Sequence, residues 1–116
     1  MLLKVKHKEC RDGIHIIELD GNLDADTNLL FEQKAAPLLA GHPGRLILDM
    51  SRLKYIDSMG LASVLRIRKT IEETGGMLAA AGLSPRIREV FKVINVLPEK
   101  NIFENMTEIE ESFHVA

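Results

Sequence analysis

Ser58 stands between Asp57 and a Met-Gly pair in "YIDSMGLASVL", residues 55–65, where an apolar stretch gives way to a helical pattern. Three roles fit a serine in this place. Asp57 or Ser58 can cap the helix, Ser58 can be a nucleophile, or another enzyme can phosphorylate Ser58. A nucleophile needs a nearby base, yet the stretch is not a Gly-x-Ser-x-Gly elbow and no histidine lies near it in sequence. We therefore expect a protein without catalytic residues.

The phosphorylation hypothesis agrees with the physics of a helix start. Free backbone N–H groups and the helix dipole can accept a phosphate there without a change of fold. The modification would add about −1.5 to −2 charges and three acceptor oxygens beside Asp57. Such a change would repel an acidic partner and would cost desolvation in any close interface, which makes Ser58 a candidate release switch. A simple capping role remains the structural alternative.

The helix that must present Ser58 is predicted to run to about Thr74 and to end at Gly75 and Gly76. Its side chains divide into two arcs when each residue is advanced by about 100°. The arc expected to be buried holds Gly60, Val64, Ile67 and Ile71, flanked by Leu61 and Leu65. The arc expected to be exposed holds Ser58, Ala62, Arg66, Lys69 and Glu73, with Met59 beside it.

Five strands are predicted around this helix. Alternation and the turn signal Arg11–Gly13 indicate a hairpin, and short apolar runs indicate buried strands. The predicted strands lie at Leu3–His7, Ile14–Leu19, Arg45–Met50, Met77–Gly82 and Ile102–Phe103.

Three further helices are predicted. The first is capped by Asp24 or Asp26, ends before Gly41, and is ended or kinked about one turn early by Pro37. The next begins with Ser84 as cap and Pro85, and buries Ile87, Val90, Phe91 and Ile94. The last opens at a capping box, Thr107–Glu110, and carries Ile109 and Phe113.

The resulting order is β, β, α, β, α, β, α, β, α, in which strands alternate with crossover helices. We expect a single domain, residues 1–116, of the α/β (α+β layered) class. Its sheet should be mixed but mostly parallel, with four to five strands and about four helices. The N-terminal hairpin supplies the antiparallel pair.

Composition excludes several classes of function. The formal charge is −2, so no broad basic field exists for nucleic acid. Cys10 is alone and the histidines His7, His15, His42 and His114 are scattered, so we expect no metal site and no cofactor. No apolar run is long enough for a membrane span, and we expect a cytoplasmic protein.

Three segments resemble the STAS domain of bacterial anti-sigma factor antagonists. They are "GNLDADT" at Gly21–Thr27, "LILDMSRLKYIDSMGLASVL" at Leu46–Leu65 and "GGMLAAAGLSPRIREVFKVINV" at Gly75–Val96. The resemblance implies a non-enzymatic regulator that binds an anti-sigma factor, itself a serine kinase, and so frees a sigma factor. Phosphorylation would weaken the complex, and a serine phosphatase would reset it.

The same resemblance implies roles for single residues. Ser58 would be the phosphoacceptor, Asp57 its neighbour at the kinase interface and Asp24 a further contact, whereas Asp49 and Gly21 would shape loops. Together with the exposed arc, it predicts a partner surface of Asp24, Asp57, Ser58, Met59, Ala62 and Arg66. Position 59 is usually small in the family, so Met59 is a departure. The alternative within the same fold is a scaffold or adaptor, of the stressosome type or associated with a transporter, without a kinase cycle.

Overall fold

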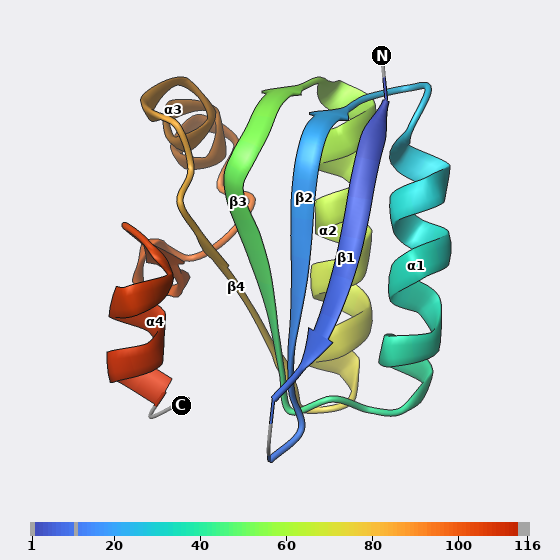
Figure 1. Ribbon diagram of the computed structural model, residues 1–116, viewed down its shortest axis with the longest axis vertical. Helices are drawn as coiled ribbons and strands as arrows, with labels where there is room; N and C mark the ends of the chain where they lie inside the picture. Colours follow the sequence, from blue (N-terminus) through green and yellow to red (C-terminus); the bar gives the residue numbers. More distant parts are fainter. Residues whose placement is uncertain (1, 11, 114–116) are drawn as a thin grey trace.

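The computed structural model describes residues 2–10 and 12–113, so Arg11 of the predicted turn and His114 lie outside the described residues. A five-stranded sheet has the order β1-β2-β3-β4-β5, antiparallel between β1 and β2 and parallel elsewhere (Figure 1). The expected mixed sheet with four helices is confirmed. The elements are β1 Leu3–Glu9, β2 Ile14–Leu23, α1 Asn28–Ala40, β3 Arg45–Ile56, α2 Ser58–Glu73, β4 Met77–Ala81, α3 Pro85–Ile94, a 3-10 turn Glu99–Asn101, β5 Ile102–Phe103 and α4 Met106–Phe113.

Helices cover both faces of the sheet. Figure 1 shows α1 and α2 side by side on one face and α4 on the other. Phe31 of α1, Val64 and Ile67 of α2 and Phe91 of α3 belong to the larger apolar cluster. Ile109 of α4 belongs to a second cluster, on Ile14, Ile16, Ile47, Ala79 and Ala81. The central strands are therefore apolar on both sides, which explains the apolar runs Leu46–Leu48 in β3 and Met77–Ala81 in β4.

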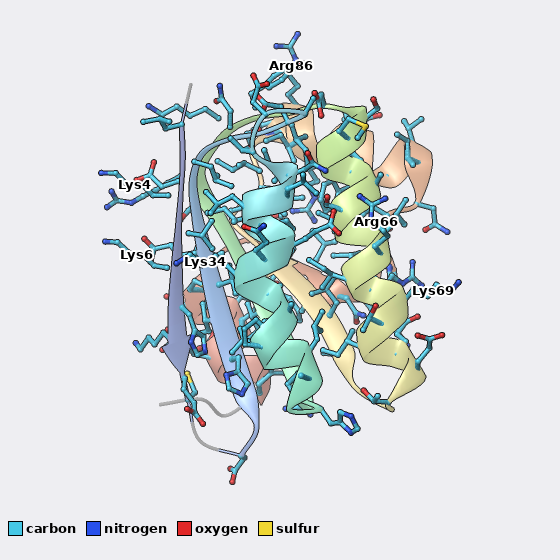
Figure 2. All side chains as sticks on the ribbon, turned by 90° about the vertical axis from the view of Figure 1, so that its right-hand side faces the viewer. Lys4, Lys6, Lys34, Arg66, Lys69 and Arg86 are labelled. Carbon is cyan, nitrogen blue, oxygen red and sulfur yellow. The ribbon has the colours of Figure 1, made fainter. Side chains whose placement is uncertain are left out.

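The edge strand β1 alternates between core and solvent. Leu3 is buried, whereas Lys4, Lys6 and Lys8 are exposed, and Figure 2 shows Lys4 and Lys6 directed away from the sheet. At the hairpin, Asp12 and Gly13 both take positive φ, 65° and 71°. Asp and Gly are residue types that tolerate this conformation, so the predicted turn forms.

The third strand is twice as long as predicted. The sequence placed a loop after Met50, but β3 continues to Ile56 because its second half pairs with β2, Asp20 with Arg52 and Leu23 with Ile56. Exposed polar residues in this half hide the strand from an apolar pattern, and only Leu53 is fully buried. The strand therefore runs to the residue before Asp57, and no flexible loop precedes Ser58.

Helix α1 begins and ends differently from the prediction. Neither Asp24 nor Asp26 caps it, because the capping position is Thr27 and α1 starts at Asn28. Pro37 does not end the helix early, since α1 continues to Ala40. Proline removes the N–H that would bond the carbonyl of Gln33. Pro37 and Gln33 are both exposed, so water can satisfy that carbonyl.

The ends of α3 and α4 give one confirmation and two corrections. Ser84 caps α3, its Oγ accepting the N–H of Ile87 at 3.3 Å, as predicted. Ile94 is 49% exposed rather than buried, because α3 ends there and the chain turns at left-handed Asn95. Thr107 does not open α4. The helix begins at Met106, and Asn105 Oδ1 accepts the N–H of Glu108 at 2.9 Å.

Pro37→Ala should increase the free energy of unfolding by about 1 to 3 kcal/mol, because alanine restores the missing hydrogen bond within α1. Urea unfolding followed by circular dichroism measures the change. Gln33→Ala, at an exposed position of the same helix, is the matched control and should change stability by less than about 0.5 kcal/mol. A Pro37→Ala protein no more stable than wild type would contradict this account of α1.

Candidate functional site

Asp57 is the cap of α2. Its backbone is extended, with φ −113° and ψ −173°, and its Oδ1 accepts the N–H groups of Met59 at 2.9 Å and Gly60 at 3.0 Å. Ser58 is therefore the first residue of the helix. Of the two capping candidates that the sequence left open, Asp57 has this role and the hydroxyl of Ser58 does not.

The other contacts of Asp57 join α2 to the end of β2. Its Oδ2 accepts the N–H of Ala25 at 3.2 Å, and its own N–H donates to the carbonyl of Leu23 at 3.2 Å. Gly60 allows the same close approach, because a Cβ there would overlap the Leu23 carbonyl oxygen and lie 2.8 Å from Ile56 Cγ1. The loop from Asp24 to Thr27 and the start of α2 are thus brought to one place, although 32 residues separate Ala25 from Asp57.

Ser58 is exposed at this helix start. Among the described residues, no hydrogen bond involves its hydroxyl. The described histidines lie away from Ser58. His7 and His15 contact each other at 2.9 Å across β1 and β2, and His42 follows the end of α1. The hydroxyl is accessible to a second protein, and none of the described histidines lies beside it as an activating base.

Asp24 holds its own loop. Its Oδ1 accepts the N–H of Asp26 at 3.0 Å, and the Thr27 hydroxyl accepts the N–H of Asp24 at 3.0 Å while donating to the carbonyl of Asn22 at 2.7 Å. The carboxylate is half-buried. Asp24 therefore shapes the loop that meets Asp57, and a contact of Asp24 with a partner stays a prediction.

The exposed arc predicted for α2 is largely confirmed. Ser58, Arg66, Lys69 and Glu73 are exposed, and Ala62 is half-buried. Met59, beside the arc, is 45% exposed. The predicted buried stripe is also confirmed, together with Leu61, but Leu65 is 37% exposed. The predicted partner residues Ser58, Met59 and Arg66 are thus exposed on α2, and partner binding stays a prediction.

Arg66 lies two turns down from Ser58 and is turned toward α1. It contacts Glu32 at 2.7 Å, and the buried Ser63 hydroxyl donates to the same carboxylate. The Arg66 hydrogen bond is the largest cause that lowers the pKa of Glu32 below its ordinary value, with Ser63 second. Sequence reasoning missed Glu32 and Ser63. A serine inside the buried stripe of α2 was the available signal, because a buried hydroxyl needs a partner.

The described residues contain no group of three or more His, Cys, Asp or Glu side chains arranged to hold a metal ion. In the same part of the chain, no helix combines the length and apolarity needed to cross a membrane.

Removal of the Asp57 carboxylate should destabilise the protein, because this one carboxylate caps α2. Asp57→Ala leaves the N–H groups of Met59, Gly60 and Ala25 without their acceptor, and we expect the free energy of unfolding to fall by about 1 to 2 kcal/mol. Chemical denaturation measures the loss. Asp26→Ala is the matched control, since the Asp26 side chain is exposed and makes no hydrogen bond within the described chain. Equal losses in both variants would show that the cap is not the source.

The Glu32 cluster should make stability depend on pH. A folded-state pKa below the ordinary value of 4.5 means that the stabilisation is present above pH 4.5 and is lost as pH falls through the folded pKa. We therefore expect the free energy of unfolding to fall more steeply for wild type than for Glu32→Gln as pH decreases from about 6 to about 3. Urea unfolding at each pH provides the comparison, with Glu89→Gln on α3 as control. Parallel curves for wild type and Glu32→Gln would refute the assignment.

Comparisons with known proteins agree with this geometry. The STAS domain model matches residues 6–109. A Bordetella bronchiseptica protein named as an anti-sigma factor antagonist, BtrV, is 32% identical over 93 residues, which cover 78% of this chain and 80% of that protein. The anti-sigma F factor antagonist of Paenibacillus polymyxa is 25% identical over 103 residues, 84% and 88% of the two chains. The phosphorylated form of the Bacillus cell fate determinant SpoIIAA superposes with a TM-score of 0.78 at 20% identity, covering 95% of this chain and 99% of that one. The chain belongs to the STAS domain family.

Proposed function

We propose that the protein is an anti-sigma factor antagonist. Its unphosphorylated form binds a cognate anti-sigma factor that is also a serine kinase, and the sigma factor is thereby freed. Phosphorylation of Ser58 weakens that complex, and a serine phosphatase restores the active form. The names of the relatives BtrV and the anti-sigma F factor antagonist support the class of partner.

One observation carries the proposal for this chain. Ser58 presents an exposed hydroxyl that forms no hydrogen bond with the described residues, on a helix start that Asp57, Ala25 and Gly60 hold in place. A phosphate added there lies at the positive end of the α2 dipole, which favours an anion, while the N–H groups of Met59 and Gly60 stay bonded to Asp57 and the helix start is preserved. The effect of modification falls on the surface that a partner contacts.

The remaining parts of the proposal follow from the same site. Asp24, Asp57, Ser58, Met59, Ala62 and Arg66 form the partner surface. The protein acts by binding and has no catalytic residue, cofactor or metal of its own. It works in the cytoplasm, where sigma factors and their regulators meet, and it contacts neither nucleic acid nor membrane.

Ser58→Ala should bind the cognate anti-sigma factor about as tightly as wild type and should not be phosphorylated by it in the presence of ATP. Ser58→Asp should bind at least about tenfold more weakly, because it places a charge in the interface. Isothermal titration calorimetry measures the affinities, and mass spectrometry locates the phosphate. Ser112→Ala, at an exposed position of α4, is the control and should still accept one phosphate.

Two outcomes would count against the proposal. Equal affinities of the Ser58→Ala and Ser58→Asp proteins would remove the release switch. Tight binding of partners without any phosphorylation of Ser58 would instead favour the adaptor role.

A further inference from the structure

The rotation of α1 and α2 about their axes is fixed by the contacts of Glu32 with Ser63 and Arg66. Leu29 lies three residues before Glu32 and Met59 four residues before Ser63, so each lies one turn earlier on the same side of its helix. Leu29 and Met59 are therefore each placed in the first turn of their helix, on the side that carries the contacts of Glu32 with Ser63 and Arg66. Figure 2 shows the two helices side by side, with Arg66 on α2.

These side chains are large, apolar and open to solvent. Leu29 is 66% exposed and Met59 45% exposed. Ala25, whose N–H is bonded to Asp57, is exposed, and Ala62, one turn after Ser58, is half-buried. We call Ala25, Leu29, Met59 and Ala62 the apolar patch. An exposed apolar surface framed by polar residues is typical of a protein-binding site, and this one adjoins Ser58.

The charges within the two segments that carry the apolar patch are acidic, and the adjoining Arg66 is paired with Glu32. Residues 21–33 and 55–65 contain Asp24, Asp26, Glu32 and Asp57, and neither segment contains a lysine or an arginine. Among the described residues, Glu32 is paired with Arg66, whereas the three aspartates form no ion pair. A partner that places basic side chains near these aspartates is complementary in charge to this surface, although Asp24 and Asp57 are already hydrogen-bonded within the chain. A second copy of this chain would set carboxylates against carboxylates.

We propose that the anti-sigma factor docks on the apolar patch with an apolar side chain that lysine or arginine residues surround. Phosphate at Ser58 then releases the partner because the phosphate must lose its water and crowds the interface, and not because like charges repel each other. The inference rests on the proposed function and specifies its partner and its release step. Added negative charge would attract a basic partner. The complex weakens because a dianion must lose its water beside Leu29 and Met59 when the interface closes.

The salt dependence of binding separates the two mechanisms. Dissociation constants of the unphosphorylated and Ser58-phosphorylated proteins for the cognate anti-sigma factor are compared at about 0.05 M and about 0.5 M salt, where screening differs strongly. We expect the dissociation constant of the phosphorylated protein, divided by that of the unphosphorylated protein, to stay constant or to increase with salt concentration. A ratio that falls toward one at high salt would show charge repulsion and would overturn the proposal.

Substitutions in the apolar patch give an independent test. Leu29→Ala and Met59→Ala should each weaken binding of the unphosphorylated protein about tenfold. They should also reduce the ratio between the dissociation constants of the phosphorylated and unphosphorylated proteins. Val93→Ala, which trims a 76% exposed side chain on α3, should leave binding unchanged. Thermal unfolding confirms that the variants fold.

Different results would contradict the docking proposal and the proposed function. If wild type binds and is phosphorylated at Ser58 but both patch variants bind as tightly as wild type, the docking proposal is wrong and the proposed function stands. If wild type itself neither binds the anti-sigma factor nor accepts phosphate, the proposed function fails first.

Discussion

The carboxylate of Asp57 is the constraint on which the rest of the site depends. One side chain bonds three backbone N–H groups, two in the first turn of α2 and one at Ala25 in the loop before α1. Because α2 and the β2–α1 loop share this acceptor, the position of Ser58 is fixed relative to two helices and two strands. Gly60 permits the arrangement, since any larger residue would separate α2 from the end of β2.

The stability of this helix start depends on Asp57 and not on the hydroxyl of the neighbouring Ser58. Asp57 is occupied by backbone hydrogen bonds, and Asp24 by its own loop, so neither carboxylate needs a partner protein to be satisfied. Ser58 makes none of these bonds. A group can therefore be attached to it and removed from it repeatedly while the contacts that hold the fold remain in place.

The sequence predicted the elements well and their ends less well. Apolar periodicity located both faces of α2 and the Ser84-Pro85 start of α3, because burial and local capping decide these features. It missed the second half of β3, where pairing with β2 and not apolar content makes the strand. It also missed the start of α1 after Thr27, and of the two outcomes left open at Pro37 the early end did not occur.

For the candidate site, the sequence predicted the exposure of Ser58 and of the arc on α2 but not the Glu32 cluster, because a contact between residues 32 and 63 requires the packed pair of helices. A different consequence follows from the lysines of β1. If two copies joined by antiparallel pairing of their free β1 edges, centred on Lys6, lysine would stand opposite lysine along the seam. Repulsion between these lysines therefore disfavours edge-to-edge pairing of the sheets of two molecules.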